Sequence, residues 1–532
     1  MNIENWLIGI DAVLDPGVLI FIVLGCLVGI VVGALPGISA TVGVAVLLPF
    51  TFSLDPLPGM MLLLGIYGGA VYAGSIPAIL IRSPGTPASA ATVEDGNAMA
   101  KQGRAAEALS ISVVASSLGG LAGVVALGLF APLLAGIALA FGPAEYFLLA
   151  VLALTVVASV SENRLVKGLI SGVLGVGLAL IGLDTIQAYP RLSFDDPNLA
   201  AGIGFIPVLI GLFAVSEAFV QFERSRGRTL GQAAVQKFRP TLSWLRGITP
   251  PILLSSPIGF IIGIIPGTGG DISAFVAYNE AKRAARDKRR FGKGEPRGIA
   301  AAETAKNAGT AGALVPMLTL GIPGDVTTAV LIGAITVHGL RPGPELFTGS
   351  PELVYGIFVG FLLTYLVMLV IGLLGTGLWS RLITGIPTRY LWPTVLVLSM
   401  IGAFAVRSNP FDVLVMVVFG VIGYLMTKFG FPLAPMVIGL IVGPIAESGY
   451  RRTMIIHDGG FGWLLEPIPL VLSALIVLSV GFAVRRAVRS PSGTEAEGDG
   501  HEPPAQEETR TVDGLQDTEG TGHEPGSGRD PA

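Results

Sequence analysis

The sequence predicts an all-α polytopic membrane protein with two homologous halves of inverted topology and with broken or re-entrant helices at Pro-Gly motifs. Three observations predict this class: an apolar composition poor in charge, an internal repeat, and Pro-Gly pairs inside apolar runs. Of the 532 residues, 52% are hydrophobic and 13% are charged, whereas soluble chains average about 25% charged. A mean hydropathy of +0.73 does not suit a soluble chain of this length, because single soluble cores stop growing near 250–300 residues. We therefore expect the apolar residues to face lipid.

The same composition excludes several classes of function. Cys26 is the only cysteine, and the four histidines show no ligand spacing, so we expect no disulfide framework, no zinc site and no cofactor beyond a coupling ion such as Na⁺. No GxxxxGK[ST] motif occurs, so the chain is not expected to hydrolyse ATP by the P-loop route. No Ser/His/Asp or HExxH arrangement points to an enzyme.

Charge divides the chain into a membrane body and a tail. Residues 490–532 hold eleven acidic residues against Arg510 and Arg529, while the preceding 489 residues carry a formal charge of +5. We predict an N-terminal segment (1–16) without the basic region of a signal peptide, a first membrane repeat followed by a basic loop (17–246), a second repeat (247–489) and a disordered acidic tail (490–532).

Apolar runs along the body indicate ten to fourteen membrane segments, since a helix needs about 20 apolar residues to cross the bilayer. The candidates are 18–35, 59–81, 107–141, 145–160, 165–183, 201–220, 250–265, 308–321, 326–340, 352–380, 391–406, 411–427, 432–446 and 465–484.

Basic residues cluster in loops 224–246 and 282–297 and after the last segment, at Arg485, Arg486 and Arg489. Clusters that flank apolar spans are topology signals more often than nucleic-acid sites, so we place all three in the cytoplasm and expect no nucleic-acid partner. The stretch 250–281 between the two loops is too short for two full spans, which favours a re-entrant or broken helical pair.

Four sequence matches, in the same order in both halves, indicate a duplication. Gly33–Ala40 matches Gly263–Gly270 at an offset of 230, and Ser75–Gly85 matches Leu314–Gly324 at 239. Further on, Pro143–Tyr146 matches Pro387–Tyr390, and Pro207–Leu212 matches Pro435–Leu440. The basic loop after Gly267 has no counterpart after Gly37, which favours an inverted over a parallel repeat. Inverted repeats are typical of secondary transporters, whose sites lie near the midplane on discontinuous helices.

Pro-Gly pairs break the apolar runs twice in each half, at Pro36-Gly37, Pro84-Gly85, Pro266-Gly267 and Pro323-Gly324. Irregular backbone at membrane depth persists only where protein or a water-filled cavity covers it. Helix N-termini at such breaks present free N–H groups that suit carboxylates, and neighbouring hydroxyl groups add donors. We expect substrate to bind at Pro36, Gly37, Ser39, Thr41, Ser83, Gly85, Thr86, Thr268, Gly269, Gly270, Asn307, Gly324, Thr327 and Thr328.

Two acids, Asp271 and Asp325, follow breaks of the second half, and acids inside a membrane are costly and usually functional. We expect one or both to bind Na⁺ or to carry H⁺. Alternatives stay open: small residues also serve helix packing, Arg82 suits either a substrate carboxylate or an interface, and Lys306, Tyr67 and Tyr72 are further candidates. The two aspartates would also suit an intramembrane aspartyl protease. A channel is a further alternative, but the matched breaks in both halves favour a carrier.

The motifs resemble those of the large membrane subunit of the tripartite tricarboxylate transporters, the TctA family. The resemblance runs from about residue 17 to 485 and rests on Gly33-Ala-Leu-Pro-Gly-Ile-Ser-Ala-Thr41, Tyr67-Gly-Gly-Ala-Val-Tyr-Ala-Gly-Ser-Ile-Pro77, Ser83-Pro-Gly-Thr-Pro87, Gly263-Ile-Ile-Pro-Gly-Thr-Gly-Gly270, Gly321-Ile-Pro-Gly-Asp325 and Ala434-Pro-Met-Val-Ile-Gly-Leu440.

The resemblance implies a permease in the cell membrane (the inner membrane of a Gram-negative cell) that works with a small membrane subunit of about four helices and an extracytoplasmic solute-binding protein. It implies uptake of citrate or other carboxylates driven by a cation gradient. The runner-up is a stand-alone cation-coupled dicarboxylate or anion symporter without a binding protein.

Overall fold

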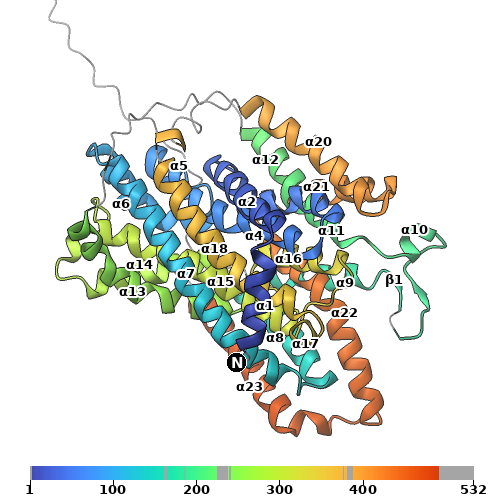
Figure 1. The fold of residues 1–532 in the computed structure, drawn as a ribbon. Helices are drawn as coiled ribbons and strands as arrows, with labels where there is room; N and C mark the ends of the chain where they lie inside the picture. Colours follow the sequence, from blue (N-terminus) through green and yellow to red (C-terminus); the bar gives the residue numbers. More distant parts are fainter. Residues whose placement is uncertain are drawn as a thin grey trace, which may run out of the picture. The chain divides into compact units, whose positions relative to one another are not determined.

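The computed structural model describes residues 3–160, 165–184, 186–224, 238, 241–375, 377–379 and 388–489. Predictions for most of the basic loop 224–246 and for the tail 490–532 therefore lie outside the described residues. Residues 1–487 form one contact unit, so both halves contribute to a single body of helices (Figure 1).

The first half is almost entirely helical. Its elements are α1 (Ile3–Val13), α2 (Pro16–Ala34), α3 (Ala40–Leu47), η1 (Leu48–Ser53), α4 (Pro56–Ala73), α5 (Ser75–Ile81), η2 (Pro87–Ser89), α6 (Ala90–Lys101), α7 (Ala105–Ala138), α8 (Pro143–Val160), α9 (Leu165–Ala179), β1 (Gly182–Leu183), β2 (Pro190–Arg191), α10 (Pro197–Ala200), α11 (Phe205–Leu209), the π-helical turn η3 (Ile210–Val215) and α12 (Ser216–Arg224).

The second half repeats the alternation of long and short helices. Its elements are α13 (Leu242–Ile264), α14 (Gly269–Ala284), η4 (Lys288–Arg290), α15 (Pro296–Leu320), α16 (Val326–Val337), α17 (Glu345–Gly349), α18 (Pro351–Leu374), α20 (Thr388–Arg407), α21 (Pro410–Lys428), α22 (Leu433–Ile456), η5 (Gly462–Leu465) and α23 (Pro467–Arg489).

Within the described ranges, nine helices are long and apolar enough to cross a membrane, and five shorter apolar helices accompany them. The shorter ones include α9, α16 and the stretch Ala40–Ser53. The sequence-predicted pair within 250–281 is present as α13 and α14, which meet at the break after Ile264. The helical polytopic class that the sequence predicts is thus confirmed.

The four breaks have matching backbone conformations at the offsets that the repeat predicts. Gly37 and Gly267 are equivalent at the offset of 230, and both adopt positive φ angles, of 89° and 81°. Arg82 and Gly321 are equivalent at the offset of 239, and both end a helix in the left-handed region. Their N–H groups bond to the carbonyl oxygens of Pro77 and Pro316, which are themselves equivalent. The sequence similarity therefore corresponds to similar local structure.

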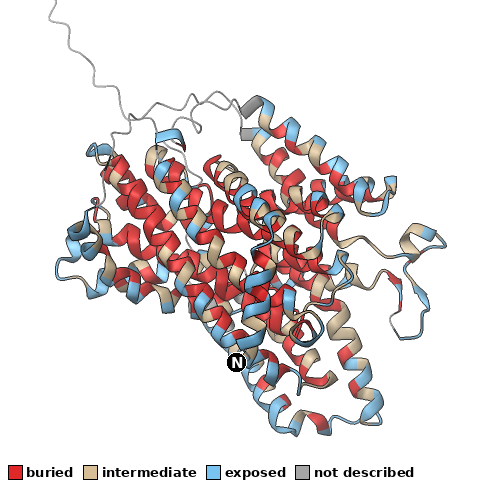
Figure 2. Ribbon diagram, in the orientation of Figure 1, coloured by how far each residue is buried: buried red, intermediate tan, exposed pale blue. Residues whose placement is uncertain are grey.

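Helix α15 forms the centre of the molecule, and every residue from Gly298 to Thr319 is buried (Figure 2). Its alanines and glycines allow the neighbouring backbones to approach closely, as small residues do in membrane proteins. A Cβ atom on Gly119 of α7 would lie 2.3 Å from the carbonyl oxygen of Thr304, and one on Gly259 of α13 would lie 2.3 Å from that of Ala305. In contrast, α20, α21 and α23 carry many exposed aliphatic side chains, as expected of helices that face lipid.

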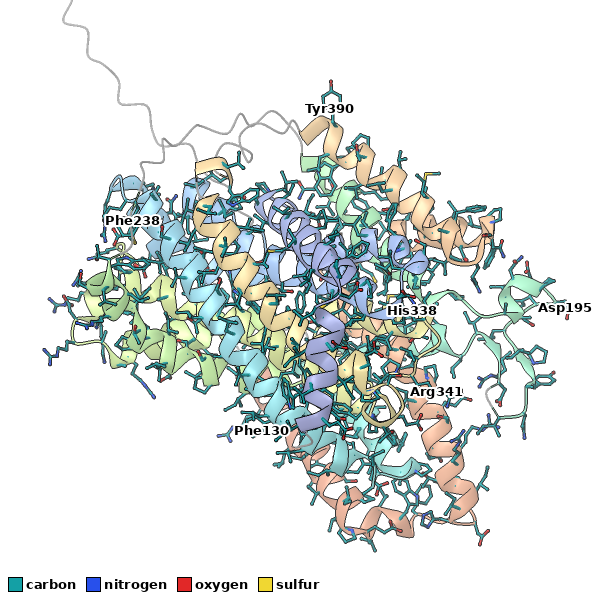
Figure 3. The ribbon with its side chains drawn as sticks, in the orientation of Figure 1. Phe130, Asp195, Phe238, His338, Arg341 and Tyr390 are labelled. Atoms are coloured by element: carbon teal, nitrogen blue, oxygen red, sulfur yellow. The ribbon has the colours of Figure 1, made fainter. Side chains whose placement is uncertain are left out.

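Strands β1 and β2 pair antiparallel, with Gly182 opposite Arg191 and Leu183 opposite Pro190. The loop that holds them extends away from the helices, and the exposed Asp195 lies at its outer end (Figure 3). Asp184 at the base of this loop is anchored to α22 by an ion pair with Arg451, while Arg191 pairs with Glu447 at 2.5 Å.

Candidate functional site

A cavity of about 280 Å³ lies where segments that follow the Pro-Gly breaks of both halves meet. Most of its lining belongs to the starts of α3, η2, α14 and α16, and the remainder comes from α4, η3, α15 and α22. The lining residues are Ser39, Ala40, Thr41, Tyr67, Val71, Thr86, Pro87, Ala88, Phe213, Gly267, Thr268, Gly269, Gly270, Asp271, Thr310, Asp325, Val326, Thr327 and Ala434.

The N-termini of helices from both halves open onto this cavity. The first residues of α3, α14 and α16 line the cavity, and the N-terminus of a helix presents a partial positive charge. Ser39 accepts a hydrogen bond from the N–H of Val42 at 3.3 Å and so caps α3. Such ends are suited to a bound anion.

Asp325 caps α16 from the cavity wall. Its Oδ1 accepts hydrogen bonds from the N–H and the hydroxyl of Thr328 at 2.7 and 2.9 Å, and its Oδ2 accepts one from the Tyr67 hydroxyl. Tyr67 is fully buried in α4, so a phenol of the first half holds a carboxylate of the second. Gly269 approaches Asp325 so closely that a Cβ atom would lie 2.8 Å from the Cβ of the aspartate.

Asp271 lies in the first turn of α14, and its carboxylate accepts a hydrogen bond from the N–H of Ala88 at 3.0 Å. The residue also lines the cavity. The acid of one half therefore caps the helical turn of the other half.

A second contact between the two halves is equivalent, under the repeat, to the contact of Asp271 with Ala88. The hydroxyl groups of Thr41 and Thr327 lie 2.8 Å apart, and both residues are buried. Thr41 corresponds to Asp271 at the offset of 230, and Ala88 corresponds to Thr327 at the offset of 239, as in the first two sequence matches. The contacts Thr41 to Thr327 and Asp271 to Ala88 are thus counterparts under the repeat.

Nine of the predicted site residues line this one cavity: Ser39, Thr41, Thr86, Thr268, Gly269, Gly270, Asp271, Asp325 and Thr327. Seven do not line it: Pro36, Gly37, Ser83, Gly85, Asn307, Gly324 and Thr328. The first set stands two to five residues after the proline of a break, where the next helix begins, whereas most of the second set belongs to the break itself.

The glycines of the second set serve packing. A Cβ atom on Gly85 would lie 2.5 Å from the carbonyl oxygen of Gly33, and one on Gly324 would lie 2.5 Å from Cα of Ala313. Gly37 packs against the side chain of Gln221.

The polar members of the second set point elsewhere. Thr328 caps α16, and Asn307 bonds within α15 to the carbonyl oxygen of Glu303 at 3.1 Å. Arg82 forms an exposed ion pair with Glu94 at 2.9 Å, which favours an interface role over the binding of substrate.

Sequence reasoning missed eight lining residues: Ala40, Val71, Pro87, Ala88, Phe213, Thr310, Val326 and Ala434. Phe213 and Ala434 immediately flank the repeat match of Pro207–Leu212 with Pro435–Leu440, so this match was the available signal. Thr310 gives no signal of its own, because it is one of many small residues in α15.

The polar groups of the described lining residues include no basic side chain. None of the described residues that line the cavity is Lys or Arg. Among the residues that the structure describes there is also no group of three or more His, Cys, Asp or Glu side chains that would hold a metal ion. The available groups are hydroxyls, backbone N–H groups and two carboxylates.

Comparison with known proteins identifies the family. Residues 19–438 match the model of the tripartite tricarboxylate transporter TctA family. A relative from Agrobacterium vitis, described as an uncharacterized 52.8 kDa protein in the TAR-I ttuC' 3' region, is 36% identical over 489 residues, which cover 92% of this chain and 97% of the relative. An uncharacterized protein in the TAR-II ttuC' 3' region of the same organism is 34% identical over 233 residues, or 44% of this chain and 96% of the relative. No solved structure matches the chain significantly. The chain belongs to the tripartite tricarboxylate transporter TctA family.

Proposed function

We propose that this multi-pass membrane protein, a component of a tripartite tricarboxylate transporter by its family, is the permease subunit of a binding-protein-dependent secondary transporter. It imports tricarboxylates or related carboxylates by alternating access, and a Na⁺ or H⁺ gradient drives the uptake. Its partners are an extracytoplasmic solute-binding protein and a small membrane subunit of about four helices. It works in the cell membrane, the inner membrane in a Gram-negative cell, with its C-terminus in the cytoplasm.

The observation that carries this proposal is the composition of the cavity. Hydroxyl groups and helix N-termini from both halves surround a space that also contains Asp271 and Asp325, and no basic side chain is among the lining residues that the structure describes. Donors without a fixed counter-charge suit an anion that must be released again, whereas two carboxylates suit a cation.

The two aspartates make carboxylate binding depend on a cation. A substrate carboxylate about 4 Å from an unneutralised aspartate would be destabilised by about 4 kcal/mol at an effective dielectric constant of 20. That cost corresponds to about a thousandfold loss of affinity. Binding of Na⁺ or H⁺ at Asp271 and Asp325 removes the repulsion, so the cation binds before the substrate or together with it.

The size of the cavity favours a small substrate. Its volume of about 280 Å³ lies just below the range of about 300–1,000 Å³ of most ligand pockets. A compact di- or tricarboxylate fits this volume better than a larger conjugate.

The contacts between halves support an inverted repeat. Thr41 bonds to Thr327, and the equivalent Asp271 bonds to Ala88. Reciprocal contacts of this kind are expected around a two-fold axis. The basic loop that follows only the second-half break favours an axis in the membrane plane, which is the arrangement associated with alternating access.

The test is uptake of labelled carboxylates by proteoliposomes that contain the chain and its co-purified membrane subunit. A panel of carboxylates is offered with and without the solute-binding protein, and the Na⁺ and pH gradients are varied separately. We expect uptake that requires the binding protein and one of the gradients, and that Asp271→Ala abolishes. Uptake without a binding protein would favour the stand-alone symporter. Uptake that neither the Na⁺ nor the pH gradient affects would exclude symport. Proteolysis that Asp271→Ala abolishes would favour an intramembrane protease.

A further inference from the structure

A buried polar network lies directly behind the cavity wall, around an ion pair on α15. Lys306 Nζ and Glu303 Oε2 lie 2.9 Å apart, and both side chains have no exposed surface. The hydroxyl groups around the pair come from α5, η2, α6 and α7 of the first half. They belong to Ser75, Ser89, Thr92, Ser112 and Ser116.

Glu303 is bonded to hydroxyl groups on every side. Its Oε1 accepts from Ser75 and Thr92 at 2.5 and 2.6 Å, and its Oε2 accepts from Ser112 and Ser116 at 3.0 and 2.8 Å. Charge-assisted bonds of this number account for a carboxylate that is stable without water. The ion pair is therefore held in one orientation, with Lys306 on the side of the cavity.

Lys306 is linked to the cavity by two hydroxyl groups. Its ammonium donates to Ser75, to Glu303 and, at 3.2 Å, to Ser89 Oγ. Ser89 Oγ in turn lies 2.7 Å from Thr86 Oγ1, and Thr86 lines the cavity. The chain of contacts runs from the ion pair through Ser89 to the cavity wall.

The chemistry of these groups favours one direction for the hydrogen bonds. An ammonium only donates, so Ser89 Oγ accepts from Lys306. Ser89 Oγ also lies 3.2 Å from Ser75 Oγ, whose proton is used by Glu303 in the shorter contact. Between Ser89 and Thr86 either hydroxyl can donate, and with Ser89 as the donor the proton of Thr86 is left for a partner in the cavity. Thr86 does not use its side chain to cap η2, although it occupies the N-cap position.

We propose that Lys306 and Ser89 are positioning residues that orient the Thr86 hydroxyl as a hydrogen-bond donor to a carboxylate group of the substrate. This inference rests on the proposed function and adds the place at which the anion is received. Lys306 thereby favours an anion without contacting it, and its charge stays paired with Glu303 throughout.

The equivalent break of the second half has the opposite polarity. At the offset of 239, Thr86 corresponds to Asp325, Ser89 to Thr328 and Lys306 to Tyr67. Asp325 accepts hydrogen bonds from both Thr328 and Tyr67, so this side of the cavity ends in an acceptor. One break thus presents a donor suited to the carboxylate, and the other presents an acceptor suited to the cation.

The test compares Ser89→Ala with Ser112→Ala in the purified full-length protein, with citrate as the probe in calorimetry. Both variants lose one hydroxyl of the network, but Ser112 contacts Glu303 Oε2 and takes no part in the link from Lys306 through Ser89 to Thr86. We expect Ser89→Ala to raise the dissociation constant of citrate about tenfold, as for the loss of a hydrogen bond to a charged group. Ser112→Ala is expected to change it less than about twofold, and equal constants for the two variants would overturn the inference.

A double-mutant cycle with Thr86→Val separates positioning from general destabilisation. Ser89→Ala is expected to have no further effect on citrate binding once Thr86 has lost its hydroxyl. Additive effects would show that Ser89 acts by another route and would overturn the inference. The double variant Lys306→Met with Glu303→Gln removes both charges of the ion pair and so leaves no unpaired charge. We expect it to weaken citrate binding as Ser89→Ala does. Unchanged citrate binding by this double variant would also contradict the role of Lys306.

The proposed function fails separately from this inference. If the wild-type protein, supplied with Na⁺ at neutral or acidic pH, bound neither citrate nor any other carboxylate of the uptake panel, the proposed function would be wrong, and the inference with it. If the wild-type protein binds citrate and Ser89→Ala binds it equally well, only the inference is wrong.

Discussion

Asp325 and Asp271 are held in different ways, and this difference matters for the chemistry of the cavity. The carboxylate of Asp325 accepts hydrogen bonds from the N–H and the hydroxyl of Thr328 and from the hydroxyl of Tyr67. The carboxylate of Asp271 accepts one from the N–H of Ala88. Each carboxylate therefore has partners of its own, which suits separate roles better than a shared proton between two acids.

We expect Asp325→Asn to raise the cation concentration needed for half-maximal carboxylate uptake by about tenfold or more, because a neutral amide replaces a charged ligand. The amide retains an oxygen that can accept from Thr328, so the cap of α16 is kept. The measurement is initial uptake rate against Na⁺ concentration and against pH. Asp195→Asn on the exposed loop is the control and should leave both curves unchanged; an unchanged curve for Asp325→Asn would refute cation coupling at this residue.

The contact between Thr41 and Thr327 is a hydrogen bond between the halves and should contribute to stability. Thr41→Val, Thr327→Val and the double variant should show a coupling free energy of about 0.5–1.5 kcal/mol in chemical unfolding in mixed micelles. Thr336→Val is the matched control on the same helix, since the hydroxyl of Thr336 bonds to the carbonyl of Ile332 within α16. A coupling near zero would mean that the two hydroxyls do not interact.

At the scale of elements, the breaks act as junctions where backbones of different helices meet. Gly85 follows α5, and its N–H donates to the carbonyl of Gly74 at 2.9 Å. The amide of Gly267 likewise donates to the carbonyl of Gly324 at 2.7 Å, which joins the two breaks of the second half. These junctions leave no space for side chains.

Gly85→Ala should destabilise the protein by about 1–3 kcal/mol, because its Cβ would lie 2.5 Å from the carbonyl oxygen of Gly33 and the packed backbones must shift. The control is Gly136→Ala on α7, where nothing lies within 4 Å of an added Cβ. That variant should be neutral or stabilising by up to about 1 kcal/mol. Thermal unfolding in detergent measures both, and equal unfolding temperatures would show that the junction tolerates a methyl group.

The loop of β1 and β2 is held to α22 by a network of charges around Asp184. The N–H groups of Gln187 and Ile186, together with Arg451, lower the pKa of Asp184 from its ordinary value of 3.8 to about 2. Glu447 accepts from Arg191 and also lies 3.4 Å from Arg451. The network therefore connects a loop of the first half to a helix of the second half.

The lowered pKa predicts a defined dependence of stability on pH. Because the folded-state pKa lies below the unfolded one, the ionised Asp184 stabilises the fold fully above about pH 4, and this stabilisation is lost as the pH falls toward 2. Asp184→Asn should therefore lower the unfolding temperature at neutral pH, and the difference from wild type should shrink between about pH 4 and pH 2. A difference that is the same at all pH values would show that the charge of Asp184 is not the cause.

At the scale of the whole molecule, thiol labelling in one cysteine-free variant can test on which side of the membrane each loop lies. Cys26 is the only cysteine and is buried, so Cys26→Ala provides a cysteine-free chain. In this background, Arg289→Cys and Gln187→Cys place a thiol in the basic loop and in the β1–β2 loop, at exposed positions.

We expect a membrane-impermeant maleimide to label Gln187→Cys in intact cells and Arg289→Cys only after the membrane is opened. The basic loop is expected in the cytoplasm, and the β1–β2 loop is separated from the basic stretch after Arg224 by one candidate span, Phe205–Glu223. Labelling of both positions from the same side would contradict this topology.

Composition and pattern determine much of the architecture because lipid imposes simple rules on a sequence. Apolar runs predict helices, and Pro-Gly pairs predict their interruption, since proline lacks an N–H and glycine accepts positive φ angles. The residues that follow each break, such as Thr41, Thr86 and Asp271, could be predicted as cavity residues, because the start of a helix is a local property of the chain.

Which of these residues meet depended on contacts between positions far apart in the sequence. The pairing of Thr41 with Thr327, the phenol of Tyr67 on Asp325 and the packing role of Gly85 and Gly324 are known only from the tertiary structure. The same holds for the ion pair of Lys306 and Glu303. Its two residues are close in sequence, but the hydroxyl groups that stabilise it come from four elements of the other half. The sequence by itself determined where helices break and which chemistry the breaks carry, because those are local effects of proline, glycine and polar side chains. Only the tertiary structure decided which side chains share a cavity, because that depends on how helices distant in sequence pack together.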